Sequence, residues 1–86
     1  MSKTPDAAAQ QMRALVETCE ILEMLRPAAG AGVREWFEYH RHCAQTYVIF
    51  ADRQSDADVA FEARWRAGRE TLLARDFRSR LPAAGK

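Results

Sequence analysis

Apolar residues recur at steps of three and four along three stretches of the chain, which cover about residues 5–26, 33–53 and 56–79. Residues at this spacing lie on one face of an α-helix. The first stretch shows the pattern most clearly, with Ala8, Met12, Leu15, Cys19 and Leu22. A connector with one proline and two glycines, residues 27–32, separates the first two stretches, and residues 53–58 separate the last two. The pattern therefore predicts three helices joined by two short turns.

The second and third stretches each carry an apolar stripe that we expect to face the core. In the second stretch the stripe consists of Val33, Trp36, His40, Cys43, Ala44, Tyr47 and Ala51. In the third stretch it consists of Phe61, Trp65, Gly68 and Leu72. Segment 47–50 has the composition of a strand, but it continues the helical stripe in phase and has no second strand to pair with. We therefore interpret it as helix.

Residues near the ends of the predicted helices suit helix caps. Thr4 can cap the first helix, with Pro5 at the first helical position and Asp6 where the helix dipole favours an anion. Ser55, followed by Asp58 three residues later, resembles a capping box at the start of the third helix.

Short connectors between long helices favour antiparallel neighbours. The sequence therefore predicts an all-α fold, an antiparallel three-helix bundle. We expect a single helical domain over residues 1–86, with residues 1–4 and 80–86 frayed. A core of this size gives only modest net stability, so oligomerisation would help to complete it.

Composition and charge narrow the class of protein. Hydrophobic residues make up 48% of the chain and charged residues 29%, a balance typical of a soluble globular protein. The net charge of +1 provides no bulk field to attract nucleic acid or an anionic membrane. The sequence contains no apolar run of membrane-spanning length and too few cysteines for a disulfide scaffold, and its first six residues lack the apolar stretch typical of a signal peptide. We therefore expect a cytoplasmic protein with free thiols and no membrane partner.

Three potential metal ligands lie on the predicted core faces. With residue 26 opposite residue 33, Cys19 would lie level with His40 and about one turn from Cys43. Two thiolates and an imidazole suit zinc or another soft metal, but the third helix offers no fourth ligand. The alternative is a buried, hydrogen-bonded histidine with two thiols packed as small apolar groups. We expect this alternative, and therefore neither a metal site nor a cofactor.

The sequence contains no convergent set of acid, base and nucleophile. Its carboxylates alternate with arginines on polar faces, and its glycines do not form a phosphate-binding loop. We therefore expect a protein that is not an enzyme.

Apolar residues also occur on the polar sides of all three predicted helices. They are Ile21 and Met24 in the first helix, Ile49 in the second, and Val59, Leu73 and Phe77 in the third. A three-helix bundle buries one broad stripe per helix, so these residues would be exposed on a monomer. Clustered exposure of this kind indicates an interface. We expect these six side chains to bind a partner, with Arg75 and Arg78 orienting it.

Two functional hypotheses follow from these patterns. The first is a small protein-binding module, an adaptor, regulator or inhibitor, that docks an apolar helix face onto another protein or a second copy of itself. Its length and helical class suit small bacterial or phage proteins of this kind. The alternative is a nucleic-acid-binding helical protein that uses Arg64, Arg75 and Arg78 of the third helix. A metal-binding protein built on Cys19, His40 and Cys43 is the weaker alternative.

Overall fold

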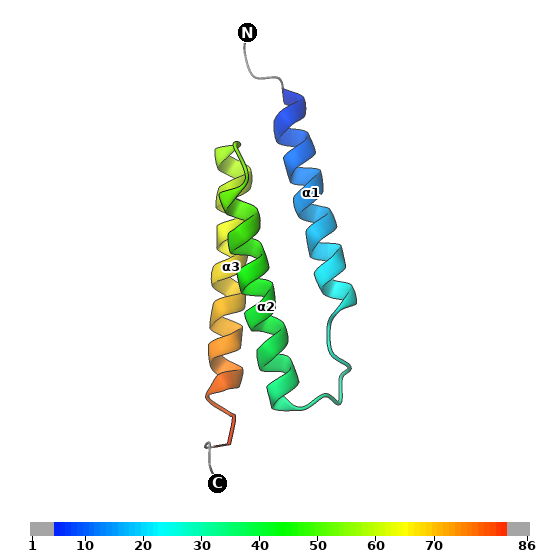
Figure 1. Ribbon diagram of the computed structural model, residues 1–86, viewed down its shortest axis with the longest axis vertical. Helices are drawn as coiled ribbons and strands as arrows, with labels where there is room; N and C mark the ends of the chain where they lie inside the picture. Colours follow the sequence, from blue (N-terminus) through cyan, green and yellow to red (C-terminus); the bar gives the residue numbers. More distant parts are fainter. Residues whose placement is uncertain (1–4, 83–86) are drawn as a thin grey trace.

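The computed structural model describes residues 5–82 and consists of three helices. They are α1 (Pro5–Met24), α2 (Val33–Asp52) and α3 (Ala57–Arg78), which run in alternating directions (Figure 1). No strand occurs within residues 5–82. The predicted all-α, antiparallel three-helix bundle is confirmed, and the predicted helix ends lie within two residues of the observed ones. The predicted cap at Thr4 and the predicted fraying of residues 1–4 and 83–86 lie outside the described residues. Residues 80–82, which were also predicted to fray, follow α3 outside the helix, and the N–H groups of Arg80 and Leu81 still donate to carbonyl oxygens of its last turn.

Helices α2 and α3 form a closely packed hairpin, and they lie side by side along their length in Figure 1. The seam between them is built from small side chains. Its buried alanines are Ala44 and Ala51 of α2 and Ala60, Ala63, Ala67 and Ala74 of α3. The distance between two packed helices depends on the side chains at the contact, and alanine permits a close approach. The hairpin is therefore the most compact part of the molecule.

Helix α1 packs less closely on this hairpin and is anchored at a few points. Its side chains Leu15 and Leu22 are 1% and 4% exposed and enter the core. The amide of Gln11 donates to Ser55 Oγ at 2.8 Å and accepts from the Asp56 N–H at 3.0 Å. These two hydrogen bonds tie α1 to the turn between α2 and α3.

The starts of α2 and α3 are capped by carboxylates. Glu35 accepts a hydrogen bond from the Gly32 N–H at 3.0 Å. Asp56 accepts from the N–H groups of Asp58 and Val59, both at 3.0 Å. The prediction that Ser55 caps α3 was therefore wrong: Asp56, one residue later, satisfies the free amides. Ser55 instead accepts the hydrogen bond from α1.

The buried face of α3 is the opposite of the predicted one. Phe61, Trp65 and Leu72 were expected in the core, but their exposed fractions are 70%, 53% and 63%. Ala63 and Ala67 lie inside instead. The physical reason is that α3 carries apolar residues on two faces, and only the alanine face permits the close approach to α2. The predicted core stripe of α3 is thus a surface stripe.

Among residues 5–82, no helix combines the length and apolarity needed to cross a lipid bilayer.

Candidate functional site

A polar cavity of about 270 Å³ lies where the three helices meet. It is lined by side chains from every helix, including Cys19, Tyr39, His40, Cys43, Tyr47 and Glu70. Because it gathers most of the titratable chemistry of the core, it is the first candidate site. The contacts within it decide whether these groups are available to a ligand.

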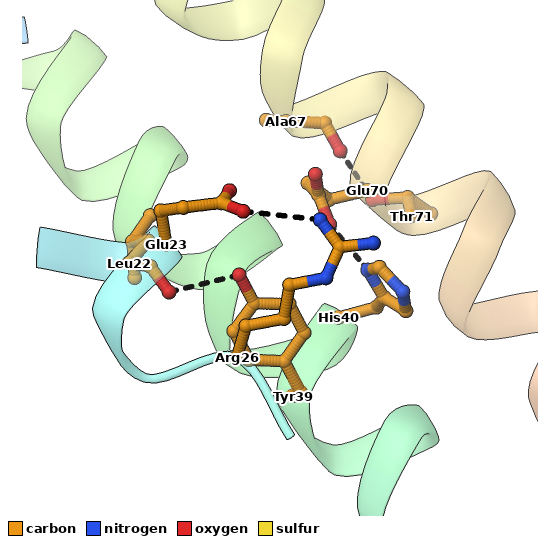
Figure 2. Close-up of polar contacts among 8 residues, drawn as sticks. All are labelled: Leu22, Glu23, Arg26, Tyr39, His40, Ala67, Glu70 and Thr71. Atoms are coloured by element: carbon orange, nitrogen blue, oxygen red, sulfur yellow. Dashed lines mark hydrogen bonds and ion pairs between the residues drawn. The ribbon is translucent and has the colours of Figure 1, made fainter. Parts of the chain in front are cut away.

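His40 in this cavity is held by Glu70 of α3 (Figure 2). The His40 Nδ1 atom lies 2.6 Å from Glu70 Oε1, and the two side chains are 12% and 20% exposed. The rings of Trp36 and Phe77 stack on the imidazole, with centroids at 5.8 and 5.5 Å. A short contact between a mostly buried imidazole and a carboxylate ties α2 to α3. His40 is therefore engaged at its Nδ1 atom and is packed in a cluster with the rings of Trp36 and Phe77, whose centroids lie 6.0 Å apart.

Tyr39 closes the end of α1. Its hydroxyl donates to the carbonyl oxygen of Leu22 at 2.8 Å (Figure 2), as a second hydrogen bond to an atom that already accepts from the Leu25 N–H at 3.1 Å. Next to it, Arg26 forms an ion pair with Glu23 at 3.1 Å and lies over the ring of Trp36 at 5.5 Å. Burial, and after it the neighbouring Cys43, raises the pKa of Tyr39 well above its usual value. This hydroxyl therefore remains protonated at neutral pH and acts as a donor.

The two thiols are also engaged or enclosed. The Tyr47 hydroxyl donates to Cys19 Sγ at 3.1 Å. Cys43 is 2% exposed, and burial raises the pKa of its thiol to about 11. A thiol that is buried and protonated at neutral pH is a poor nucleophile and a poor metal ligand. Cys43 is therefore a packing residue.

The residues weighed as metal ligands, Cys19, His40 and Cys43, all line this cavity. The Cys19 thiol accepts a hydrogen bond from Tyr47, which lies one helical turn beyond Cys43. Within residues 5–82, no three histidine, cysteine, aspartate or glutamate side chains lie close enough to hold a metal ion together. The polar contacts of the cavity instead join α1, α2 and α3 to one another.

The second candidate site is the outward side of α3, where Phe61, Trp65, Gly68 and Leu72 form one row, here called the outer stripe. Its three large side chains are more than half exposed. The guanidinium of Arg69 lies over the ring of Trp65 at 5.4 Å. An added Cβ at Gly68 would meet nothing within 4 Å, so the stripe has a gap at its centre. Three large apolar side chains in one row are a candidate docking surface.

The predicted partner-binding residues of the third helix lie mostly inside. Val59 is 2% exposed, Leu73 lines the polar cavity, and Phe77 stacks on His40. Their expected place on the exposed side of α3 was wrong, because the helix is turned by half a revolution relative to the prediction. Arg75 and Arg78 are exposed and border a shallow hollow.

The predicted partner-binding residues of the other two helices are exposed, as expected. Ile21 is 58% exposed, Met24 83% and Ile49 53%. They lie on α1 and α2 and are not part of the outer stripe. Partner binding by these residues stays a prediction.

A signal in the sequence could have identified the outer stripe. Ala60, Ala63, Ala67 and Ala74 recur at steps of three, four and seven, which is the helical period. The prediction placed the face with the largest apolar side chains, the aromatic row, in the core. The criterion of how closely a neighbouring helix can approach would have placed the alanine face there instead.

Comparisons of this chain with protein-family models, with curated proteins and with solved structures found no match.

Proposed function

We propose that this protein is a non-enzymatic interaction module that binds another polypeptide through the outer stripe of α3. The observation that carries the proposal is the exposure of Phe61, Trp65 and Leu72 in one row, on the side of α3 that faces away from the α2 seam. A large apolar row on a surface gains free energy when a partner removes it from water. Aromatic side chains at the centre of such a patch are typical binding anchors.

The polar cavity supports this proposal by its contacts. His40 is paired with Glu70, Cys19 accepts from Tyr47, and Cys43 is buried with a raised pKa. These groups stabilise the arrangement of the three helices, which in turn fixes the outward direction of the outer stripe. The stripe therefore lies on a rigid hairpin, as an interaction surface requires.

Photocrosslinking in the host cell tests this function. A benzoylphenylalanine placed at Phe61 would contact any polypeptide docked on the outer stripe. The same group at Val16, which is 49% exposed on α1 and is not among the predicted partner-binding residues, is the matched control. We expect discrete adducts from position 61 that position 16 does not give, identified by mass spectrometry. Identical products from both positions, or none from position 61, would overturn the proposal.

Nucleic-acid binding is the alternative function, and one feature favours it. Arg41, Arg75 and Arg78 border the same shallow hollow, next to the ring of Phe37. The third predicted arginine, Arg64, forms an ion pair with Asp52 at 3.2 Å. Titration with single-stranded RNA and DNA at low salt distinguishes the two functions, because affinity from phosphate contacts falls steeply with salt. Absence of binding at low salt would remove this alternative.

A further inference from the structure

The outer stripe has the spacing of a helix–helix seam. Phe61, Trp65, Gly68 and Leu72 follow one another at steps of four, three and four, and Asp58 and Arg75 extend the row by three residues at each end. This alternation is the seven-residue repeat by which two helices pack against each other. The row covers about 26 Å of α3, from residue 58 to residue 75.

We propose that the occupant of the outer stripe is a second copy of this chain, with the two α3 helices antiparallel. This inference rests on the proposed function, because it names the partner of the same surface. An interface between two identical chains related by twofold symmetry must be complementary to itself. Each contact between one residue of the first copy and another residue of the second copy therefore occurs twice. The row on α3 satisfies this condition about a point between Arg66 and Ala67.

In this arrangement, large apolar side chains of one copy lie opposite smaller ones of the second copy. Reversal about that point sets Phe61 against Leu72 of the second copy, and Trp65 against Gly68 of the second copy. The largest side chain of the row thus faces the position without a side chain. The space above Gly68 is open, since a Cβ there would meet nothing within 4 Å. Close packing of helices requires such pairing of large with small residues.

The charged ends of the row match as well. The same reversal sets Asp58 against Arg75 of the second copy, and this pair occurs twice. Neither charge is buried in the isolated chain, because both residues are exposed. Oppositely charged residues at the two ends of a seam favour one register and orientation.

A second pair of charges flanks the seam. Glu62 lies beside Phe61, and Arg69 lies one heptad later, so the antiparallel arrangement brings each next to the other on the opposite copy. In the isolated chain Glu62 forms an ion pair with Arg66 at 3.3 Å, and Arg69 lies over Trp65. Both groups are within reach of the seam.

Other arrangements of the same two helices fail on these criteria. A parallel pair in register would set Asp58 against Asp58, Arg75 against Arg75 and Trp65 against Trp65. An antiparallel pair shifted by one heptad would leave Trp65 without Gly68 opposite it. Only the arrangement centred between Arg66 and Ala67 uses all six positions of the row. The order of side chains along α3 therefore selects a second copy as the partner and also fixes the register.

Sedimentation equilibrium of the full chain, from micromolar to submillimolar concentration at low salt, tests the inference. We expect a reversible dimer. Glu62→Arg and Arg69→Glu, each alone, place like charges across the seam twice and should weaken the dimer about tenfold. The double variant restores both pairs and should recover most of the affinity. Circular dichroism of each variant checks that the helices remain.

Gly68→Leu provides a second test that does not depend on charge. The isolated chain has room for this side chain, so we expect the variant to fold with at least the thermal stability of the wild type. In the dimer the same side chain would occupy the space of Trp65 of the second copy, so we expect self-association to fall at least as much as in Glu62→Arg.

The outcomes separate this inference from the proposed function. A wild-type chain that stays monomeric over the whole range, or a Gly68→Leu variant that dimerises as well as the wild type, would overturn the antiparallel self-pairing. If the charge-reversed double variant does not recover dimer affinity, the proposed register of the two α3 helices is overturned. A monomeric chain that still gives a discrete adduct with a different polypeptide from position 61 would retain the proposed function. A monomer without any adduct would remove both.

Discussion

Three polar side chains that are buried or partly buried, Tyr39, His40 and Tyr47, each form a contact that crosses between helices. The Tyr39 hydroxyl donates to the Leu22 carbonyl oxygen near the end of α1, and the Tyr47 hydroxyl donates to the Cys19 thiol. The His40 imidazole lies within hydrogen-bond distance of the Glu70 carboxylate. A buried polar group without a partner costs free energy, and these pairings avoid that cost. They also fix the relative rotation of the helices, since each bond needs a specific side chain at a specific turn. At the scale of single residues, these polar side chains hold the three helices together.

The stability of the protein should fall at alkaline pH because of Cys43. Burial raises the pKa of this thiol from its usual value near 9 to about 11. Between these two values the unfolded chain loses a proton that the folded chain keeps, so the free energy of unfolding decreases as pH rises. The contribution is fully present below about pH 9. Tyr39 and Tyr47, whose pKa values burial also raises, act in the same direction at higher pH.

Urea denaturation from pH 7 to pH 11 measures this effect. The Cys43→Ala variant is the control, and its stability should decline less between pH 9 and pH 11 than that of the wild type. Parallel curves for the two proteins would contradict the assignment to Cys43.

Helix α3 shows how one element can offer two apolar faces. One face carries Ala63 and Ala67 against α2, and the other carries Phe61 and Trp65 toward solvent. Burying the aromatic face would remove more apolar surface from water, but it would hold the helices further apart. The alanine face allows closer contact along the hairpin, and Ala51, Ala63 and Ala67 belong to the buried core. Helix α3 therefore packs through one face and leaves the other exposed to solvent.

Enlarging the alanine seam should destabilise the hairpin. Ala63 is 0% exposed, so Ala63→Leu forces extra volume between α2 and α3 and should cost about 1–3 kcal/mol. The control is Ala57→Leu, at an exposed position in the first turn of the same helix, which should change stability by about 0.5 kcal/mol or less. Thermal and urea denaturation measure both variants. Equal effects would show that the seam is not closely packed.

The whole molecule consists of a tight hairpin and a more loosely packed helix. Figure 1 shows α2 and α3 in contact along their length, with α1 set apart from them. Helix α1 depends on Leu15 and Leu22 in the core and on polar bonds at its two ends. Segments with few buried contacts open more readily than the core of a fold. We therefore expect α1 to open before the hairpin does.

Hydrogen exchange of the backbone amides measures this difference. The amides of α1 should exchange faster than those at the centres of α2 and α3. Gln11→Ala removes both bonds to the turn at Ser55 and Asp56, and it should speed exchange in α1 while leaving the hairpin unchanged. Uniform exchange over all three helices would contradict a loosely held α1.

The sequence by itself determined the three helices, their ends within two residues and their alternating directions. Periodicity and turn residues are local properties, and short connectors leave an antiparallel arrangement as the simplest one. It also indicated that the chain has more apolar surface than one core of this size buries. That expectation stands for Ile21, Met24 and Ile49, which are exposed.

The tertiary structure alone decided which face of α3 is buried. Val59, Leu73 and Phe77 lie inside or half-buried, and Phe61, Trp65 and Leu72 take the surface. The reason is physical: two faces of one helix can have similar apolarity, and only the neighbouring helix selects between them by how closely it can approach. The pairing of Cys19 with Tyr47 has the same origin, because the offset between two helices is set by packing along their length. Such offsets and rotations belong to pairs of elements, and no single stretch of sequence contains them.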